Sequence, residues 1–158
     1  MTEKELKEIL EKHELFIAGK EGGEYADLSG VNLKNANLSG ANLSCVNLSR
    51  ANLENTDLRN AELTSANLSN ADLSWCDLRN AELTSANLSN ADLKEADLRW
   101  TNLFNADLSG VNLKNANLKD ADLSRADLSG ADLSGADLSG ADLRWTNLFN
   151  ADLSGVLI

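Results

Sequence analysis

The sequence has no proline, one histidine and two cysteines, and aromatic residues make up only 4% of its 158 residues. A compact globular core normally uses more large aromatic and branched side chains than this. Two cysteines, Cys45 and Cys76, are too few for the disulfide framework of a small secreted protein. No apolar run approaches the length of a membrane-spanning helix, and the charged start 1–12 is unlike a signal peptide. These absences predict a cytoplasmic protein that does not enter a membrane.

Basic residues are also scarce. Lys and Arg total 14 against 25 Asp and Glu, which gives a formal net charge of -11. Direct binding to nucleic acid or to an anionic membrane needs a basic surface, so this balance disfavours both. A basic partner protein, or solubility alone, is compatible with it.

Leucine, by contrast, stands at every fifth position from Leu28 to Leu153, 26 times in a row without insertion or deletion. Two positions before each leucine lies a small residue, Ala at 19 sites and Val, Thr or Cys at the others. Between the two comes Asp at 13 sites, Asn at 11 and Glu at the remaining two. The consensus A-(D/N)-L-x-x predicts a repeat architecture.

A period of five residues fits neither common regular element. On an α-helix, positions five apart lie about 140° apart around the axis, and on a flat strand successive leucines would alternate between the two faces. Every leucine and every small residue stays inside only if the chain turns a corner once per repeat. Four corners close a square coil. The sequence therefore predicts an all-β solenoid in which 26 repeats make about 6.5 coils, stacked about 4.8 Å apart.

Internal echoes support a coil of 20 residues. Residues 57–73 recur at 77–93, one coil later, and residues 30–38 recur at 110–118, four coils later. A third echo differs, because residues 99–111 return 45 positions later and thereby move round by one face. Gene duplication explains all three echoes, so they support the coil without deciding it.

The segments ADLSGADLSGADLSGADL, at 126–143, and SANLSNADL resemble the pentapeptide-repeat protein family over about five-sixths of the chain. This resemblance implies a right-handed quadrilateral β-helix. It also implies that leucine and the residue two before it point inward, while the other three positions of each repeat point outward.

Residues 1–24 are a different kind of sequence, which we expect to cap the β-helix of residues 25–158. Thr2 and Glu5 form a capping-box pattern that opens an α-helix, and Gly19 marks its expected end. One face of this helix carries Leu6, Ile9, Leu10, His13 and Ile17. We expect the helix to lie across the open end of the solenoid, with His13 and Phe16 in the packing.

The other end has no equivalent cap. The last repeat ends in Val156, Leu157 and Ile158, with leucine where Asp or Asn is usual. An uncapped coil presents bare strand edges and apolar side chains, which favours pairing. One hypothesis is a homodimer formed end to end through these three residues. The alternative is a truncated chain or a missing capping domain.

The pattern offers no catalytic, cofactor-binding or metal-binding residues. One histidine gives neither a His-based metal site nor a triad, and the acidic residues recur on a convex rod without a pocket. Cys76 takes an inward position and should be inert, whereas Cys45 takes an outward one, which disfavours a disulfide between them. The sequence predicts a protein that is not an enzyme and needs no cofactor.

Five aromatic residues occupy outward positions and form a candidate interaction surface: Trp75, Trp100, Phe104, Trp145 and Phe149. Exposed large aromatic side chains often mark contact surfaces. However, four of the five belong to the duplicated segment RWTNLF, and repeat counting places the three tryptophans on three different faces. That distribution argues against a single patch.

Three functions are compatible with these features. The first is a non-catalytic scaffold or protein-interaction solenoid whose partner is unknown. The second follows from the resemblance, since some acidic members of the family mimic DNA and modulate DNA gyrase. This chain has the acidic rod but lacks loop insertions, and its charge is not concentrated on one face. The third is an engineered or consensus-like repeat protein, suggested by the unbroken phase.

Overall fold

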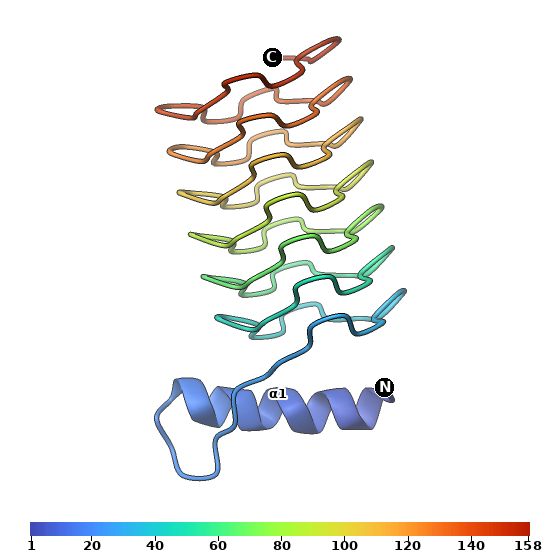
Figure 1. The fold of residues 1–158 in the computed structure, drawn as a ribbon, viewed down its shortest axis with the longest axis vertical. Helices are drawn as coiled ribbons and strands as arrows, with labels where there is room; N and C mark the ends of the chain where they lie inside the picture. The colour runs from blue at the N-terminus through green and yellow to red at the C-terminus, as the bar shows by residue number, and fades with distance from the viewer.

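The computed structural model describes the backbone of residues 1–158 and every side chain except that of Glu3. One helix, α1 (Glu3–Ile17), lies across the lower end of a stack of coils that rises to the C-terminus (Figure 1). From Asp27 onward the chain pairs with itself through isolated parallel bridges, the first with Asn47 and the last between Asp137 and Leu157. The rod is therefore a β-solenoid with a helix at one end.

The register of the bridges is constant. Each bridge joins residues 20 apart, so one coil holds four repeats of five residues and every position stacks on its own equivalent. Leucine lies on leucine, and Asp or Asn lies on Asp or Asn except at Glu62, Glu82 and Leu157, as the echo of residues 57–73 at 77–93 predicted.

Between the first and the last coil, hydrogen bonds to neighbouring coils satisfy three of the five backbone N–H groups in each repeat. In the repeat 66–70, the N–H of Asn67 donates to the coil below at 3.0 Å. The N–H groups of Leu68 and Asn70 donate to the coil above at 2.7 and 2.9 Å. The pattern repeats along the rod, because buried backbone groups must be paired.

The other two N–H groups are satisfied at the corner. The N–H of Ala71 donates to the carbonyl of Leu68 at 3.0 Å and closes a four-residue turn. The N–H of Ser69 has no backbone acceptor and donates instead to Oδ1 of Asn67 at 3.1 Å. Asp and Asn have the right length for this contact with the N–H two residues later.

The same side-chain contact recurs in 25 of the 26 repeats. It explains the Asp or Asn of the consensus, which hydropathy alone does not. The acidic character of the rod is thus in large part a consequence of how its corners are built.

The second residue after each leucine adopts a left-handed conformation, with φ between 56° and 73°. The first residue after leucine is not among the positive-φ positions, and this combination is typical of a type II turn. Glycine and asparagine tolerate a positive φ best, and they fill most of these sites.

The interior consists of the predicted ladders. The leucines from Leu43 to Leu133 are all fully buried, and the small residues two before them are buried as well in most coils. Where threonine replaces alanine, its hydroxyl still finds a partner, since Oγ1 of Thr56 donates to the carbonyl of Leu33 at 2.9 Å. No buried side-chain nitrogen or oxygen that the structure describes lacks a hydrogen-bond partner.

Helix α1 begins and ends as the sequence predicts. Thr2 and Glu5 form the capping box, and Gly19 has a φ of 62°. The N–H of Gly19 donates to Phe16 and that of Lys20 to Leu15, which is the Schellman arrangement of a helix end.

Helix α1 buries a shorter face than expected. Leu6 and His13 are buried and Ile9 and Leu10 pack against the coils, but Phe16 and Ile17 are 48% and 43% exposed. The last turn of α1 packs against the returning loop instead. There Gly23 lies so close that a Cβ would come within 2.3 Å of the Phe16 nitrogen. The expectation that Ile17 lies on the buried face was wrong.

His13 does more than fill space at this end. Its Nδ1 accepts a hydrogen bond from the N–H of Ala26 at 3.1 Å, and its Nε2 donates to the carbonyl of Ser44 at 2.8 Å. In every later coil those two backbone groups are satisfied by the preceding turn or coil. The imidazole therefore replaces the missing neighbour of the first coil.

The corner contact gives a first prediction. Changing Asn67 to Ala removes the acceptor for the Ser69 N–H, and we expect the free energy of unfolding in urea to fall by about 1 kcal/mol. Asn67→Asp, which keeps an oxygen in the same place between Asn47 and Asn87, should stay much closer to the wild type. Equal losses in the two variants would show that the side-chain oxygen does not stabilise the corner.

Candidate protein-binding surface

The aromatic residues picked out from the sequence lie where the repeat places them. Trp75 and Trp100 are 53% and 50% exposed, and Trp145 and Phe149 are 74% and 71% exposed. Phe104 is half-buried. Such a degree of exposure for large aromatic side chains is typical of contact surfaces.

The three tryptophans also take an unfavourable backbone conformation. Trp75, Trp100 and Trp145 have φ values of 63°, 58° and 61°, in the left-handed region. For a residue with a Cβ this region costs about 1–2 kcal/mol relative to glycine. Tryptophan thus occupies turn positions where asparagine or glycine would fold more easily.

One face of the rod brings aromatic rings and arginines together near the C-terminus. The guanidinium carbon of Arg125 lies 5.7 Å from the ring centre of Phe104 and 5.5 Å from that of Trp145. The guanidinium carbon of Arg144 lies 5.7 Å from the ring centre of Trp145. These distances are within the range of cation–π attraction. Counting faces separated the tryptophans correctly but missed this grouping, which joins residues of different repeats on the same face.

The register explains the grouping. Phe104, Ser124 and Arg144 are 20 residues apart in turn and stack in one ladder, and Arg125 and Trp145 stack in the next ladder. Between its larger neighbours Ser124 is only 5% exposed. We call these five residues the Arg125 patch.

A second arginine ladder lies on a neighbouring face and is paired throughout. Arg59, Arg79 and Arg99 each contact the aspartate two residues earlier at 2.6 Å and, for the first two, the next aspartate along the rod at 3.6 Å. Arg99 also lies 5.4 Å from the ring centre of Trp100. These exposed pairs contribute little individually, but they neutralise the face.

Arginine also changes the ionisation of its aspartate partners. Hydrogen bonds from the Arg59 side chain, at 2.9 and 2.6 Å, hold the pKa of Asp57 below its ordinary value of 3.8. The same contact from Arg144 lowers the pKa of Asp142. Carboxylates of this kind stay ionised and are unsuited to proton transfer near neutral pH.

The two cysteines lie as predicted. Cys45 is exposed and Cys76 is buried, and both are free thiols. Burial raises the pKa of the Cys76 thiol to about 12, and its sulfur donates to the carbonyl of Leu53. A thiol with so high a pKa is a poor nucleophile.

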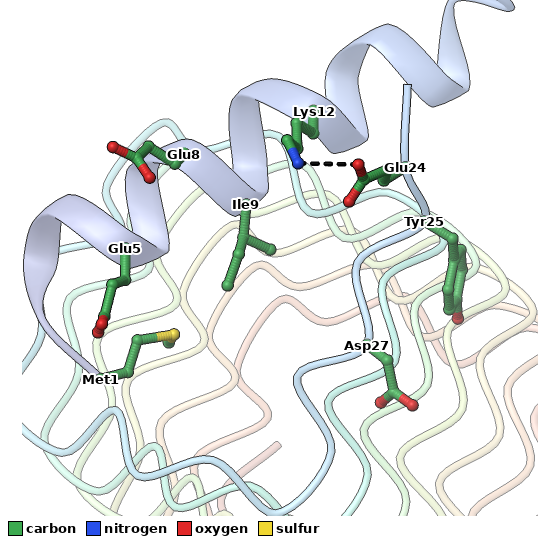
Figure 2. Close-up of a pocket in the computed structure, with 8 residues that line it drawn as sticks. All are labelled: Met1, Glu5, Glu8, Ile9, Lys12, Glu24, Tyr25 and Asp27. Carbon is green, nitrogen blue, oxygen red and sulfur yellow. Dashed lines mark hydrogen bonds and ion pairs between the residues drawn. The ribbon is translucent and has the colours of Figure 1, made fainter. Parts of the chain in front are cut away.

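A groove of about 530 Å³ lies between α1 and the first coil (Figure 2). Its walls carry Met1, Glu5, Glu8, Ile9, Lys12, Glu24, Tyr25 and Asp27. Lys12 bridges to Glu24 at 2.8 Å (Figure 2). The groove is open to solvent, and among the described side chains no group of three or more His, Cys, Asp or Glu could hold a metal ion.

The last coil exposes large apolar side chains, of which Leu153 and Ile158 occupy the inward leucine position and Leu157 occupies the outward position of Asp or Asn. Leu153, Leu157 and Ile158 are 44%, 60% and 89% exposed. The N–H groups of Leu143 and Leu148 have no partner among the described residues, because no further coil follows them in the structure. This edge is apolar and carries unpaired backbone groups.

The five-residue repeat identifies the family of the chain. A model for pentapeptide repeats matches eight copies in the chain, over residues 24–60, 41–80, 81–120 and 116–155. The chain belongs to the pentapeptide-repeat family. The resemblance inferred from the leucine spacing is confirmed, while no curated protein sequence matches the chain.

Solved structures of other pentapeptide-repeat proteins are similar in sequence. HetL, from the cyanobacterium Nostoc sp. strain PCC 7120 and involved in the regulation of heterocyst differentiation, is 34% identical over 82% of this chain and 75% of its own, with a TM-score of 0.48. A pentapeptide-repeat protein of the Arabidopsis thaliana thylakoid lumen is 31% identical over 75% and 69%, with a TM-score of 0.45. Full-length QnrB1, a plasmid-mediated fluoroquinolone resistance protein, is 24% identical over 84% and 91%, with a TM-score of 0.41.

Membership of the family does not say what the outward side chains bind, so the candidate surface is defined by this chain's own residues. The helix α1 is not long and apolar enough to cross a membrane, and the rest of the described chain contains no helix that is. The candidate surface therefore consists of the Arg125 patch, the separate tryptophans and the apolar last coil.

The aspartate–arginine contacts predict an acid sensitivity. The pKa of Asp57 is lower in the folded protein, so the folded state keeps its charge to lower pH than the unfolded chain does. Its contribution to stability is fully present above about pH 4 and is lost as the pH falls through the folded pKa. Between about pH 5 and pH 2, the free energy of unfolding should fall less steeply for Asp57→Asn than for the wild type.

Asp57→Asn keeps an oxygen that can accept the Arg59 N–H, which donates to Asp57 at 3.1 Å. The comparison, by urea denaturation at each pH, therefore isolates the charge. A variant with the same or a steeper acid dependence would contradict the assignment.

Proposed function

We propose that this protein is a non-catalytic scaffold that binds a partner protein through outward side chains of the rod. The family resemblance further supports a right-handed quadrilateral β-helix, and 26 repeats at four per coil correspond to about 6.5 coils. A rod of stacked coils presents several long faces of fixed geometry, which suits it to protein recognition.

The observation that carries this proposal is the placing of large aromatic side chains in left-handed turns. Trp145 is 74% exposed and has a φ of 61°, so it neither fills the core nor eases the turn. Unfavourable backbone conformations of this kind gather at functional sites, where a binding role offsets their cost. Tryptophan is also among the residues that contribute most to protein–protein binding.

The DNA-mimic alternative has less support. The side-chain oxygens of the Asp and Asn ladder accept hydrogen bonds from their own corners, and several carboxylates pair with arginine. Acidic residues are spread over all four faces, so no face carries the dense row of charge that a DNA duplex presents.

The proposal predicts that removing exposed aromatic side chains weakens partner binding without lowering the stability of the fold. In the double variant Trp145→Asn, Phe149→Ser, we expect the free energy of unfolding to stay within about 1 kcal/mol of the wild type, because relief of the strained turn offsets the lost cation–π contacts. The same variant should lose proteins that the wild type captures from a lysate of the source organism. Asn150→Gly, at the equivalent turn position of the last coil, is the matched control. Equal capture by all three proteins would count against the aromatic surface.

We also propose that the apolar last coil pairs with a second copy of the chain, end to end through Val156, Leu157 and Ile158. Exposed leucines and unpaired N–H groups on one edge support this pairing. Burial of the two edges against each other would remove both from water.

This pairing predicts a dimer by light scattering. Ile158→Glu, at an inward leucine position that is 89% exposed in the single chain, should shift the molecular mass toward that of a monomer, because the pairing would then bury an unpaired charge. Ser154→Glu, in the same coil but in an outward corner, should leave the mass unchanged. A monomeric wild type at high concentration would refute the pairing.

A further inference from the structure

Arg125 is held between two aromatic rings but has no acidic partner. Its guanidinium lies against Phe104 and Trp145, 5.7 and 5.5 Å from the ring centres, and no carboxylate of the described side chains lies within 4.0 Å. Its backbone is left-handed, with a φ of 60°. Arginine is thus fixed in an unfavourable turn without the ion pair that would explain it.

The other arginines of the rod differ in this respect. Four of them follow leucine directly, and each pairs with the aspartate two residues before it: Arg59, Arg79, Arg99 and Arg144. Arg50 resembles Arg125, since it lies at the same turn position with a φ of 59° and makes no ion pair with a described side chain, but it has no aromatic neighbour within cation–π distance. Among the arginines of the rod, Arg125 alone combines a guanidinium that has no ion pair with a described side chain and two aromatic rings within cation–π distance.

The surroundings of Arg125 are packed. Phe104 is half-buried, Ser124 is 5% exposed, and Oγ of Ser124 donates to Asp122 at 2.6 Å. Contact with the two rings restricts the conformations of the Arg125 side chain in the free protein, so less conformational entropy is lost when a partner binds. Trp145 adds a large apolar surface directly beside the charge.

We propose that the Arg125 patch docks an acidic segment of a partner protein, in which a carboxylate lies next to a large apolar side chain. This inference rests on the proposed protein-binding function and names the chemistry of one contact. The planar guanidinium of Arg125 would receive the carboxylate through two parallel N–H···O bonds, and the apolar side chain would lie on Trp145.

Charge distribution favours a protein segment over a nucleic acid. The whole chain has a net charge of -11, and acidic residues recur along the rod, which repels a polyanion. Arg144, the other cation of the patch, is already neutralised by Asp142 at 2.5 Å. One available guanidinium fits one carboxylate, whereas a nucleic acid strand would bring a row of phosphates.

The test is a selection of random peptides displayed on phage, with the full-length wild-type chain as bait. We expect enrichment of peptides in which Asp or Glu stands beside Leu, Phe or Trp. The best such peptide, synthesised with a fluorescent label, should lose affinity by about tenfold or more in Arg125→Asn, measured by anisotropy. Arg125→Lys should also bind weakly, because an ammonium group lacks the planar fork.

Arg50→Asn is the matched control, since it makes the same change at an equivalent left-handed turn outside the patch. It should bind the peptide like the wild type. Asparagine is frequent at this turn position, so Arg125→Asn should fold normally, and thermal unfolding followed by circular dichroism checks this.

The outcomes separate the inference from the function on which it rests. Peptides whose binding needs Trp145 but not Arg125 would overturn carboxylate docking and leave the protein-binding surface in place. Peptides that depend on neither residue, or no enrichment at all, would count against both. Tighter binding of a labelled oligothymidylate than of any peptide, lost in Arg125→Asn, would assign the anion to phosphate and overturn the inference.

Discussion

The structure depends on a single constraint: each five-residue repeat must turn a corner while all five of its backbone N–H groups find a hydrogen-bond acceptor. Two coils and one turn provide acceptors for four of them, and the side chain before each leucine provides the fifth, as in the contact from Ser69 to Asn67. Leucine fills the interior, but it cannot by itself set where the chain bends. The corner contact does so, and it repeats with the same register along the rod.

This constraint divides the surface into two kinds of position. The Asp and Asn ladder is committed to the backbone, so most of the acidic charge serves the fold and carries little information about a partner. The two residues after each leucine are free to vary in identity, although the second must accept a left-handed backbone. Where that second residue is Trp145 or Arg125 rather than Asn or Gly, local folding preference is not what selected it.

The period of five predicted much of this architecture. It gave the inward leucines, the small residues beside them and the 20-residue register, and the capping box at Thr2 predicted the helix correctly. The buried extent of α1 was harder to predict, because Ile17 has the right spacing but the chain has already begun to turn back at Gly19. His13 was assigned to packing, and its hydrogen bonds to Ala26 and Ser44 could be found only once the first coil was placed under it. The sequence did not predict the Arg125 patch, because repeat counting assigned each aromatic residue to a face separately and did not include Arg125. Tracing positions 20 apart would have found Trp145 in the ladder of Arg125, and Phe104 in the adjoining ladder one coil earlier.

The echo shifted by 45 residues has an evolutionary consequence. A duplicated block whose length is a whole number of coils places a surface motif directly above its original, whereas this block carries RWTNLF a quarter-turn further round the rod. The buried leucine ladder is unaffected, because a shift by any multiple of five residues keeps every leucine in an inward position. As a result Phe104 of one copy and Trp145 of the other lie on the same face, with Arg125 next to both rings. A duplication that leaves the core unchanged can thus bring together surface residues that neither copy grouped by itself. A pentapeptide rod can in this way acquire a new binding surface without passing through an unstable ancestor.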